Sequence, residues 1–439
     1  MQARLTYGNW MPLVIIGSLF FVFGFITWLN GALIPFLQIV CQLGEIQAML
    51  IAFSFYIAYV VMALPMSYIL EKSGYKNAMS IGLGLIAAGC LLFIPAAKSQ
   101  AFSIFLFAQF VVGSGLTILQ TASNPYLVKV GPQESAAARI SIMGLLNKGA
   151  GVLAPIIFTF LILGEFEGIS AKTFELLSPA EQASQITIMS DNLILPYLGM
   201  AIALSLLAVA LRFSDLPELD LEHEAQSLQV SHSDKTSVLH FPHLILGVVT
   251  LFFYVGVEVI AGDTIGLLGS GLGVENATSL TSFTMFFMVI GYLLGLFLTP
   301  RFISQKTLLI ASALSGIAFS ICVIYSNPAH FGVSEMLWGW LGIQTIPNTV
   351  AFVALLGLSN AIVWPAVWPL ALQNLGYFTA KGSALLIMGI AGGAILPMVF
   401  GVLSSHYSPI DAYWMMVPCY LFILFYGIKG CSMTTWRRA

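Results

Sequence analysis

The chain has 439 residues, of which 59% are hydrophobic and 8% are charged, and its formal net charge is −3. Soluble domains carry about 25% charged residues, so this composition excludes a water-soluble globule and indicates a protein that crosses a membrane many times. There is no basic patch that could bind nucleic acid, so the expected partners are membrane lipid and a small solute.

A helix that crosses a bilayer needs roughly 20 mostly apolar residues. Twelve segments meet this requirement, and in chain order they cover 11–37, 46–70, 77–97, 101–128, 140–164, 192–213, 243–270, 279–299, 307–326, 349–374, 382–404 and 410–431. The predicted fold class is therefore an all-α membrane protein with twelve transmembrane helices.

Two polar stretches interrupt this series of spans. The acidic linker 214–242 follows the sixth span and divides the chain into an N-terminal six-helix bundle, 1–213, and a C-terminal six-helix bundle, 243–439. The stretch 165–191, between the fifth and sixth spans, is partly amphipathic and forms either a surface helix or a solvated loop.

Lysine and arginine are distributed unevenly between the two sides of the membrane. With the N-terminus inside, thirteen of the sixteen fall in cytoplasmic segments, two (Lys98 and Lys172) fall outside, and Lys148 lies within a span. Cytoplasmic loops of membrane proteins carry an excess of positive charge. We therefore expect both termini to be cytoplasmic.

Short sequences recur at corresponding places in the two halves. LFFVFG at 19–24 is echoed by LFFYVG at 251–256, which is 232 residues later, and IMG at 142–144 recurs at 387–389. Twelve spans in two repeated halves resemble the major facilitator superfamily. That resemblance implies a substrate site near the midplane between the halves, and alternating access by rocking of one half against the other.

Three charged side chains lie within apolar spans: Lys148 in the fifth, and Glu258 and Asp263 in the seventh. A charge near a bilayer centre costs ~2.5–3.5 kcal/mol on insertion scales, so it is retained mainly where it has a function. We predict that Lys148 approaches Glu258 or Asp263 in at least one state and that the three residues couple transport to a cation. The alternative is a static structural salt bridge.

Glu258 and Asp263 are five residues apart, which is about 140° around an ideal helix. Both can face one point only if the helix breaks, and Ala261–Gly262 between them is the expected place, because glycine tolerates unusual backbone angles. Released carbonyls there, with Asp263 and Glu258, are the predicted ligands of a Na⁺ ion. No bound cofactor is expected, and the five cysteines are scattered without a disulfide or metal-site pattern.

A sugar needs hydrogen-bonding groups and a flat apolar surface. Trp364 and Trp368 are four residues apart in the tenth span and so share one helix face; Trp28 is a third candidate. Amide side chains both donate and accept hydrogen bonds. The candidate substrate-binding amides are Asn30, Gln120, Asn124, Asn147 and Asn360.

The loop after the second span, SYILEKSGYK at 67–76, resembles the facilitator signature G-x-x-x-D-R-x-G-R-K. It departs at Ser67, and Glu71 replaces the aspartate. Glu71, Lys72 and Lys76, with Arg139 after the fourth span, are candidate gating residues that latch neighbouring helices on the cytoplasmic side. The alternative is ordinary positive-inside charge.

Several motifs resemble the fucose–galactose–glucose symporter family of this superfamily. They are WLNG at 28–31, QTASNPY at 120–126, GPQES at 131–135 with Arg139, and VGVEV at 255–259. Asn147-Lys148 and Gly262-Asp263 look most similar to the bacterial N-acetylglucosamine and glucose branch. The resemblance implies a monomeric importer of the cytoplasmic (inner) membrane that takes up a monosaccharide of the glucose, galactose or N-acetylglucosamine type by Na⁺ or H⁺ symport.

Two departures from that family concern the coupling ion. Its proton-coupled fucose carriers have an aspartate where this chain has Gly31 and a glutamate where it has Gln120, so their proton mechanism does not carry over. The repeat offset of 232 places Asp263 at the position equivalent to Gly31. This favours Na⁺ slightly over H⁺ and leaves glucose and N-acetylglucosamine balanced.

Other functions fit the sequence less well. An uncoupled sugar facilitator and an efflux carrier for another small solute remain alternatives within the transporter class. A polytopic membrane enzyme would need a polar constellation of catalytic residues in its loops, which the sequence does not offer. ATP-driven transport would need a Walker-A sequence, which is also missing.

Overall fold

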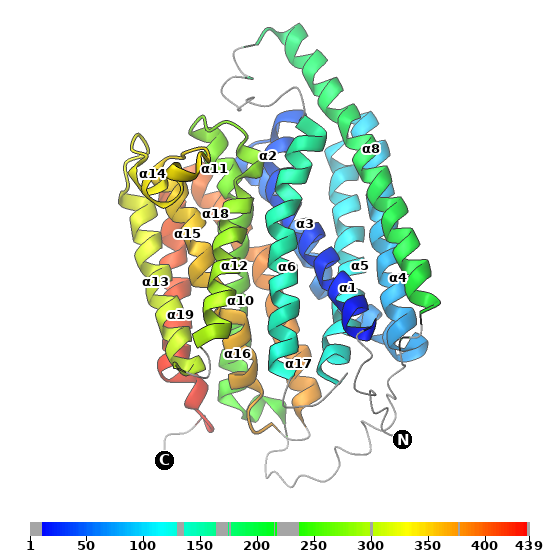
Figure 1. The fold of residues 1–439 in the computed structure, drawn as a ribbon, viewed down its shortest axis with the longest axis vertical. Helices are drawn as coiled ribbons and strands as arrows, with labels where there is room; N and C mark the ends of the chain where they lie inside the picture. Colours follow the sequence, from blue (N-terminus) through cyan, green and yellow to red (C-terminus); the bar gives the residue numbers. More distant parts are fainter. Residues whose placement is uncertain are drawn as a thin grey trace.

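The structure is a computed structural model that describes residues 11–129, 136–163, 174, 177–214, 216, 237–298, 302–375 and 378–436. Within these ranges the regular elements are all helical, as predicted (Figure 1). The motif at 131–135, the side chains of Glu71 and Asn124, and most of the linker lie outside the described residues.

The helices before the linker form the first group. They are α1 (Met11–Trp28), α2 (Asn30–Val40), α3 (Glu45–Val61), α4 (Ala63–Ser99), α5 (Phe102–Lys129), α6 (Ala136–Phe158), the π-helical turn η2 (Thr159–Leu163) and α8 (Pro179–Arg212). In this group α4 packs against α5 and α8, α1 against α6, and α3 against α5.

The helices after the linker form the second group. They are η5 (Val238–His240), α10 (Pro242–Asp263), α11 (Ile265–Gly271), η6 (Ala277–Ser279), α12 (Thr281–Leu298), α13 (Gln305–Tyr325), α14 (Gly332–Leu337), η7 (Gly339–Leu341), α15 (Asn348–Asn360), α16 (Val363–Leu372), α17 (Thr379–Met388), η9 (Gly389–Ala391), α18 (Gly392–His406), η10 (Asp411–Met415), α19 (Met416–Ile428) and η11 (Gly430–Ser432). Here α10 packs against α15, α16, α18 and α19.

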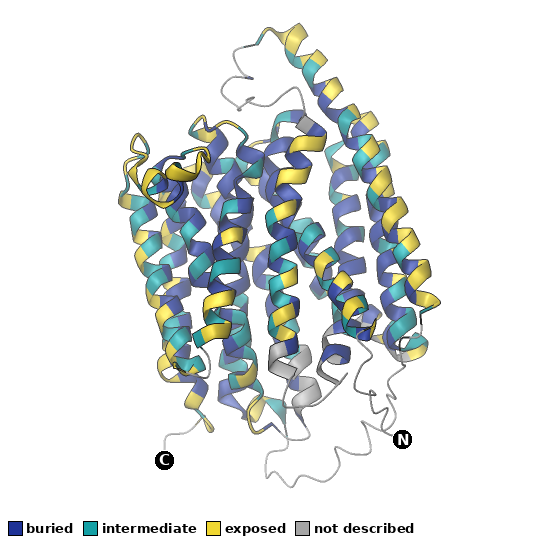
Figure 2. Ribbon diagram, in the orientation of Figure 1, coloured by how far each residue is buried: buried dark blue, intermediate teal, exposed yellow. Residues whose placement is uncertain are grey.

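These helices account for the twelve predicted spans. Eleven helical segments of the described chain are long and apolar enough to cross a membrane, and the shorter apolar helix Glu45–Val61 falls in the remaining one, the second predicted span. The chain is therefore a multi-pass membrane protein. Its outer surface agrees, because large apolar side chains are exposed along α8, among them Leu195 and Leu206 (Figure 2).

The stretch predicted at 165–191 resolves in part. A helix begins at Pro179 and continues without interruption into the sixth span as α8. Ser178 caps it by accepting a hydrogen bond from the Glu181 backbone, and the Glu181 side chain reaches back to the Ser178 backbone, a reciprocal capping box. The segment from 179 is thus the start of a long membrane helix rather than a separate surface helix.

The two repeat echoes mark equivalent helix contacts. A β-carbon on Gly24 would overlap the Asn147 carbonyl oxygen, and one on Gly392 would overlap the Phe252 carbonyl oxygen. The repeat offsets relate these two contacts. Asn147 plus 245 residues is Gly392, and Gly24 plus 232 residues is Gly256, which lies four residues after Phe252 on α10. The α1–α6 and α10–α18 crossings are therefore corresponding close approaches in the two groups.

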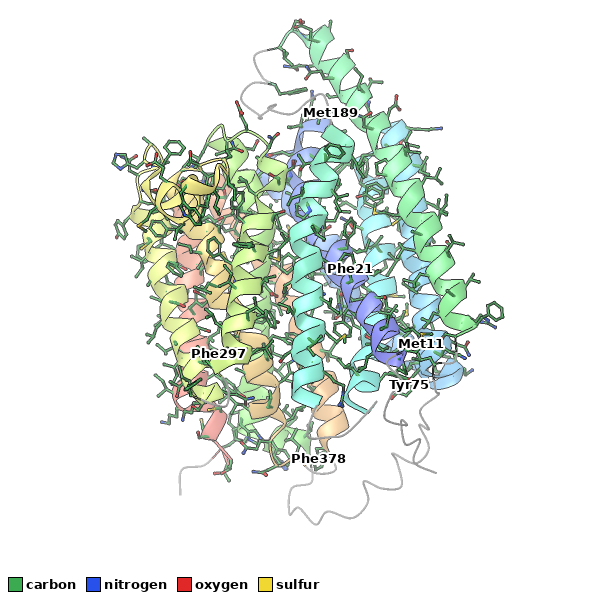
Figure 3. All side chains as sticks on the ribbon, viewed as in Figure 1. Met11, Phe21, Tyr75, Met189, Phe297 and Phe378 are labelled. Atoms are coloured by element: carbon green, nitrogen blue, oxygen red, sulfur yellow. The ribbon has the colours of Figure 1, made fainter. Side chains whose placement is uncertain are left out.

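The bundle has two ends. We call the end where α1 begins and α19 finishes the terminal end, and the opposite end the distal end. Figure 3 places Met11, Tyr75 and Phe378 toward the terminal end and Met189 toward the distal end. With the predicted topology the terminal end faces the cytoplasm.

The two groups of helices meet along two long seams and at the distal end. α6 lies beside α12 in the middle of the molecule (Figure 1), and α3 packs against α18. At the distal end α2 contacts α11 and η6, and the hydroxyl oxygens of Thr159 and Thr278 are 2.7 Å apart. The distal end is thus closed by contacts between the groups.

Candidate functional site

An ion pair joins the two groups of helices at the α6–α10 contact. Lys148 Nζ on α6 lies 2.8 Å from Glu258 Oε1 on α10. Both residues are almost fully buried, with 8% and 7% of their surface exposed. The predicted contact of Lys148 with one of the α10 acids is therefore present, and Glu258 is its partner.

Two aromatic side chains complete the surroundings of this pair. Tyr254 lies one turn before Glu258 on the same face of α10, and its hydroxyl donates to Glu258 Oε1 at 2.8 Å. The Lys148 ammonium stands 4.5 Å from the centroid of the Trp28 ring, a cation–π geometry. Trp28 fits there because Gly151 and Gly262, which lack a β-carbon, line its slot.

Trp364 and Trp368 extend the aromatic surface from Tyr254. The Trp364 ring centroid is 6.3 Å from that of Tyr254 and 5.5 Å from that of Trp368. Both tryptophan residues are only partly buried. They lie on α16, which follows an interruption of the tenth span after Asn360.

The predicted substrate-binding amides are engaged to different degrees. Asn30 and Asn360 are buried, and their side-chain oxygens accept hydrogen bonds from Gln109 and from the Tyr420 hydroxyl. Gln120 and Asn147 are partly exposed; Gln120 donates to the Tyr59 hydroxyl at 2.9 Å, and Asn147 donates to the Phe20 carbonyl at 3.4 Å. The side chain of Asn124 lies outside the described residues.

The surroundings of Asp263 differ from those of Glu258 both in exposure and in hydrogen bonding. Its side chain is fully buried, with 0% exposed, and neither carboxylate oxygen has a hydrogen-bond partner within the described chain. The Asn30 side-chain nitrogen, the Tyr56 hydroxyl and the Trp28 indole nitrogen are likewise buried without a partner. Nearly all buried polar groups in proteins are hydrogen-bonded, so a buried carboxylate with two unpartnered oxygens needs an explanation.

The predicted helix break at Ala261–Gly262 is wrong. α10 remains helical to Asp263, and the interruption falls one residue later, at Thr264. The Thr284 and Thr281 hydroxyls of α12 donate to the Ala261 and Gly262 carbonyls at 3.1 and 2.6 Å. Those carbonyls are therefore already hydrogen-bonded rather than released.

Because the helix does not break there, Glu258 and Asp263 point to different sides of α10. The predicted shared Na⁺ site of these two acids and two free carbonyls is not formed in this conformation. No cluster of three or more His, Cys, Asp or Glu residues that could hold a metal ion occurs in the part of the chain that the structure describes.

The candidate gating residues bind helix ends of the first group. Lys76 donates to the Ser214 carbonyl at 3.2 Å, just after α8, and Arg139 on α6 donates to the Leu127 carbonyl of α5 at 3.1 Å. Lys72 is exposed and stands 4.4 Å from the Tyr68 ring centroid. Cations suit the unpaired carbonyls of helix C-termini, and these contacts tie helices of one group together.

Sequence reasoning missed Tyr254, Tyr59, Gln109 and Tyr420. Tyr254 could have been found, because its spacing from Glu258 is the four-residue spacing of neighbours on a helix. The other three contact their partners across different helices, and no pattern within one span indicates such a contact.

Comparison with known proteins agrees with this architecture. The sequence matches the Major Facilitator Superfamily over residues 16–385. A glucose/galactose transporter of Brucella abortus biovar 1 (strain 9-941) is 34% identical over 416 residues, which are 94% of this chain and 92% of that protein. An L-fucose-proton symporter of Escherichia coli (strain K12) is 29% identical over 413 residues, 90% of this chain and 87% of that protein.

A solved structure has the same fold. The crystal structure of the Major Facilitator Superfamily transporter FucP in the outward conformation superposes with a TM-score of 0.69 at 24% sequence identity, covering 97% of this chain and 99% of that one.

Proposed function

Because the chain belongs to the major facilitator superfamily, we propose that it imports a monosaccharide together with a cation by alternating access. Members of this superfamily bind substrate near the midplane, between two rocking halves. The class predicted from the sequence, a transporter rather than a membrane enzyme, is confirmed by the family. The names of the glucose/galactose and L-fucose relatives support a sugar as the cargo.

The observation that carries the proposal is the Lys148–Glu258 pair beside an aromatic surface. The pair bridges the two groups of helices at a nearly buried point. Trp364 and Trp368, both partly buried, present flat rings beside Tyr254, which bonds to Glu258, and Gln120 and Asn147 provide partly exposed amide groups. A sugar ring presents one apolar face and several hydroxyls, which is the chemistry that this combination binds.

The sugar we propose is of the glucose or galactose type. The relatives named for these sugars cover more than nine-tenths of the chain. N-acetylglucosamine remains a second candidate because of the Asn147-Lys148 and Gly262-Asp263 resemblance. Its acetamido group would need an additional amide partner, for which Asn147 is available.

For the co-transported cation we propose a proton or Na⁺ that acts through Glu258, Asp263 and Lys148. The proton has support from relatives named L-fucose-proton symporters. One positive charge moving through ~100 mV gains ~2.3 kcal/mol, and at 1.4 kcal/mol per decade this drives about fifty-fold accumulation. One cation per sugar is therefore enough for uptake from dilute solution.

A second candidate function is uncoupled sugar diffusion. It is favoured by one observation: the two positions that carry coupling acids in the fucose branch are Gly31 and Gln120 here. The structure explains why Gly31 cannot simply regain its acid, since a β-carbon there would overlap the Thr281 side chain.

We further propose that the protein acts as a monomer in the inner membrane, with both termini cytoplasmic. The distribution of lysine and arginine supports this orientation. Lys76 and Arg139, which cap helix ends at the terminal end, would then stiffen the cytoplasmic side of the first group.

Uptake into proteoliposomes tests the proposal. Purified protein is given radiolabelled glucose, galactose, N-acetylglucosamine or L-fucose, with a pH gradient or a Na⁺ gradient imposed separately. Concentrative uptake of one sugar under one gradient is the expected result. Equilibration without accumulation under either gradient would establish the uncoupled facilitator, and no sugar movement at all would refute sugar transport.

A further inference from the structure

Asp263 is a buried carboxylate for which the described part of the chain provides no hydrogen bond. Its side chain is fully buried and neither oxygen has a hydrogen-bond partner within the described residues. Transferring an ionised carboxylate from water into such a site is expensive unless it is paired and hydrogen-bonded. In this conformation the carboxylate therefore needs a neutralising partner that the described residues do not supply.

The neighbours of Asp263 place it at the α3–α18 seam. Val259, one turn earlier on the same face of α10, and Tyr56 of α3 both lie against Gly393 of α18, each 3.1 Å from where its β-carbon would be. The Tyr56 hydroxyl, like the Asp263 carboxylate, is buried without a hydrogen-bond partner among the described residues. A carboxylate and a phenol, both without a partner among the described residues, thus belong to helices that meet near the seam joining the two groups.

The other ionisable groups near this place do not neutralise Asp263. On α10 itself, Glu258 adds a negative charge that Lys148 of α6 already balances. Tyr59 of α3 accepts a hydrogen bond from Gln120, and Tyr413 of η10 bonds to Thr264. Among the described residues no lysine, arginine or histidine pairs with Asp263.

The repeat relationship explains this isolation. Gly393 follows Lys148 by the same 245 residues that relate α6 to α18, so the second group has a glycine where the first has its lysine. Asp263 follows Gly31 by 232 residues, and the space beside Gly31 is filled by Thr281. One group thus contributes the buried cation and the other the buried unpaired acid.

We propose that Asp263 is the site that carries the co-transported cation, and that the distal end closes only when a monovalent cation, H⁺ or Na⁺, neutralises its carboxylate. The inference rests on the proposed transport function and assigns the coupling step to one residue. Opening the α3–α18 seam exposes Asp263 to water, where it loads or releases the cation. Closure with a bare carboxylate is disfavoured, so cation entry and the conformational change are linked.

A cysteine cross-link measures distal closure without any sugar. The Thr159 and Thr278 hydroxyls, 2.7 Å apart, join the two groups at the distal end, so T159C and T278C place two thiols within disulfide reach. The five native cysteines are replaced by alanine, and the cross-linking rate with copper phenanthroline is compared with that of the same pair carrying D263N. Normalising to D263N removes the pH dependence of thiol chemistry.

If the cation is a proton, the normalised cross-linking rate should fall by about tenfold, one decade in the closing equilibrium, as the pH rises from about 6 to about 9. Adding Na⁺ should then have no effect on this rate. For Na⁺, the rate at the higher pH should recover when Na⁺ replaces choline. Identical responses to pH and Na⁺ in the presence and absence of the Asp263 carboxylate would overturn the proposal.

A transport assay gives a second readout that does not depend on cross-linking, and D263E serves as a second variant that keeps the carboxylate. D263N should keep sugar counterflow but lose concentrative uptake, so that its final sugar ratio approaches one, whereas D263E should keep concentrative uptake. Concentrative uptake by D263N would overturn the assignment. Absence of counterflow in the unsubstituted protein would instead refute the proposed function, while the cross-linking result would still stand.

Discussion

The two acids of α10 are five residues apart in one helix and have opposite chemical surroundings. Glu258 contacts a lysine and a tyrosine hydroxyl and is slightly exposed, whereas Asp263 is fully buried and has no partner within the described ranges. Because the helix runs unbroken between them, the two acids point to different sides of α10. One helix thus holds an acid that is paired across the two groups and another acid that has no partner among the described residues.

The largest effect is expected where a paired charge is broken. K148A leaves the Glu258 carboxylate buried without its counter-ion, and removing one partner of a buried pair costs about 3–5 kcal/mol. We expect a marked drop in the thermal unfolding midpoint of the purified protein and the loss of sugar uptake.

The matched control for K148A removes both charges. The double variant with K148A and E258A should recover most of the lost stability, because no uncompensated charge remains. If K148A were as stable as the unsubstituted protein, the pair would contribute nothing measurable to the stability of the fold. If uptake by K148A kept an unchanged cation dependence, the pair would have no part in coupling.

The next effect concerns the position equivalent to Asp263 in the first group. G31A introduces a β-carbon that would overlap the Thr281 side chain, and overpacking of this kind costs about 1–3 kcal/mol. Adding T281G should relieve it. G84A is the control, since a β-carbon there meets nothing within 4 Å, and thermal unfolding is again the measurement. Equal stability of G31A and G84A would show that Thr281 does not bar a side chain from position 31.

A third effect tests the aromatic surface beside the Glu258 bridge. W364A and W368A should each raise the KM for the transported sugar by about tenfold, equivalent to about 1.4 kcal/mol of binding free energy. W340A is the control, because Trp340 is 76% exposed in the η7 turn. An unchanged KM in both test variants would separate the sugar site from this surface.

The contrast between the acids also shows how far sequence reasoning reaches. The Lys148–Glu258 contact was predictable, because a charged side chain within an apolar span needs an oppositely charged partner, and only two acids lay within the predicted spans. The unbroken helix was not, because the hydroxyls that hold the Ala261 and Gly262 carbonyls come from α12. Glycine permits a break but does not require one.

The same limit applies to the amides. Asn30 and Asn360 are polar residues in apolar spans, which made them good substrate candidates. The structure shows that partners on other helices, Gln109 and Tyr420, already engage their oxygens. The span count, by contrast, followed from hydropathy alone, because a bilayer sets the length of each crossing helix.

The smallest expected effect compares the tyrosines that accompany the two acids. Y254F removes a hydroxyl that donates to Glu258 at 2.8 Å, and hydrogen bonds to charged groups contribute about 1.5–3 kcal/mol, less here because Lys148 still pairs with the same oxygen. Y56F removes a buried hydroxyl without a partner, so it should leave the thermal unfolding midpoint unchanged or raise it slightly. A larger loss in Y56F than in Y254F would mean that the Tyr56 hydroxyl is bonded in the folded protein, and Asp263 beside it would be the first partner to consider.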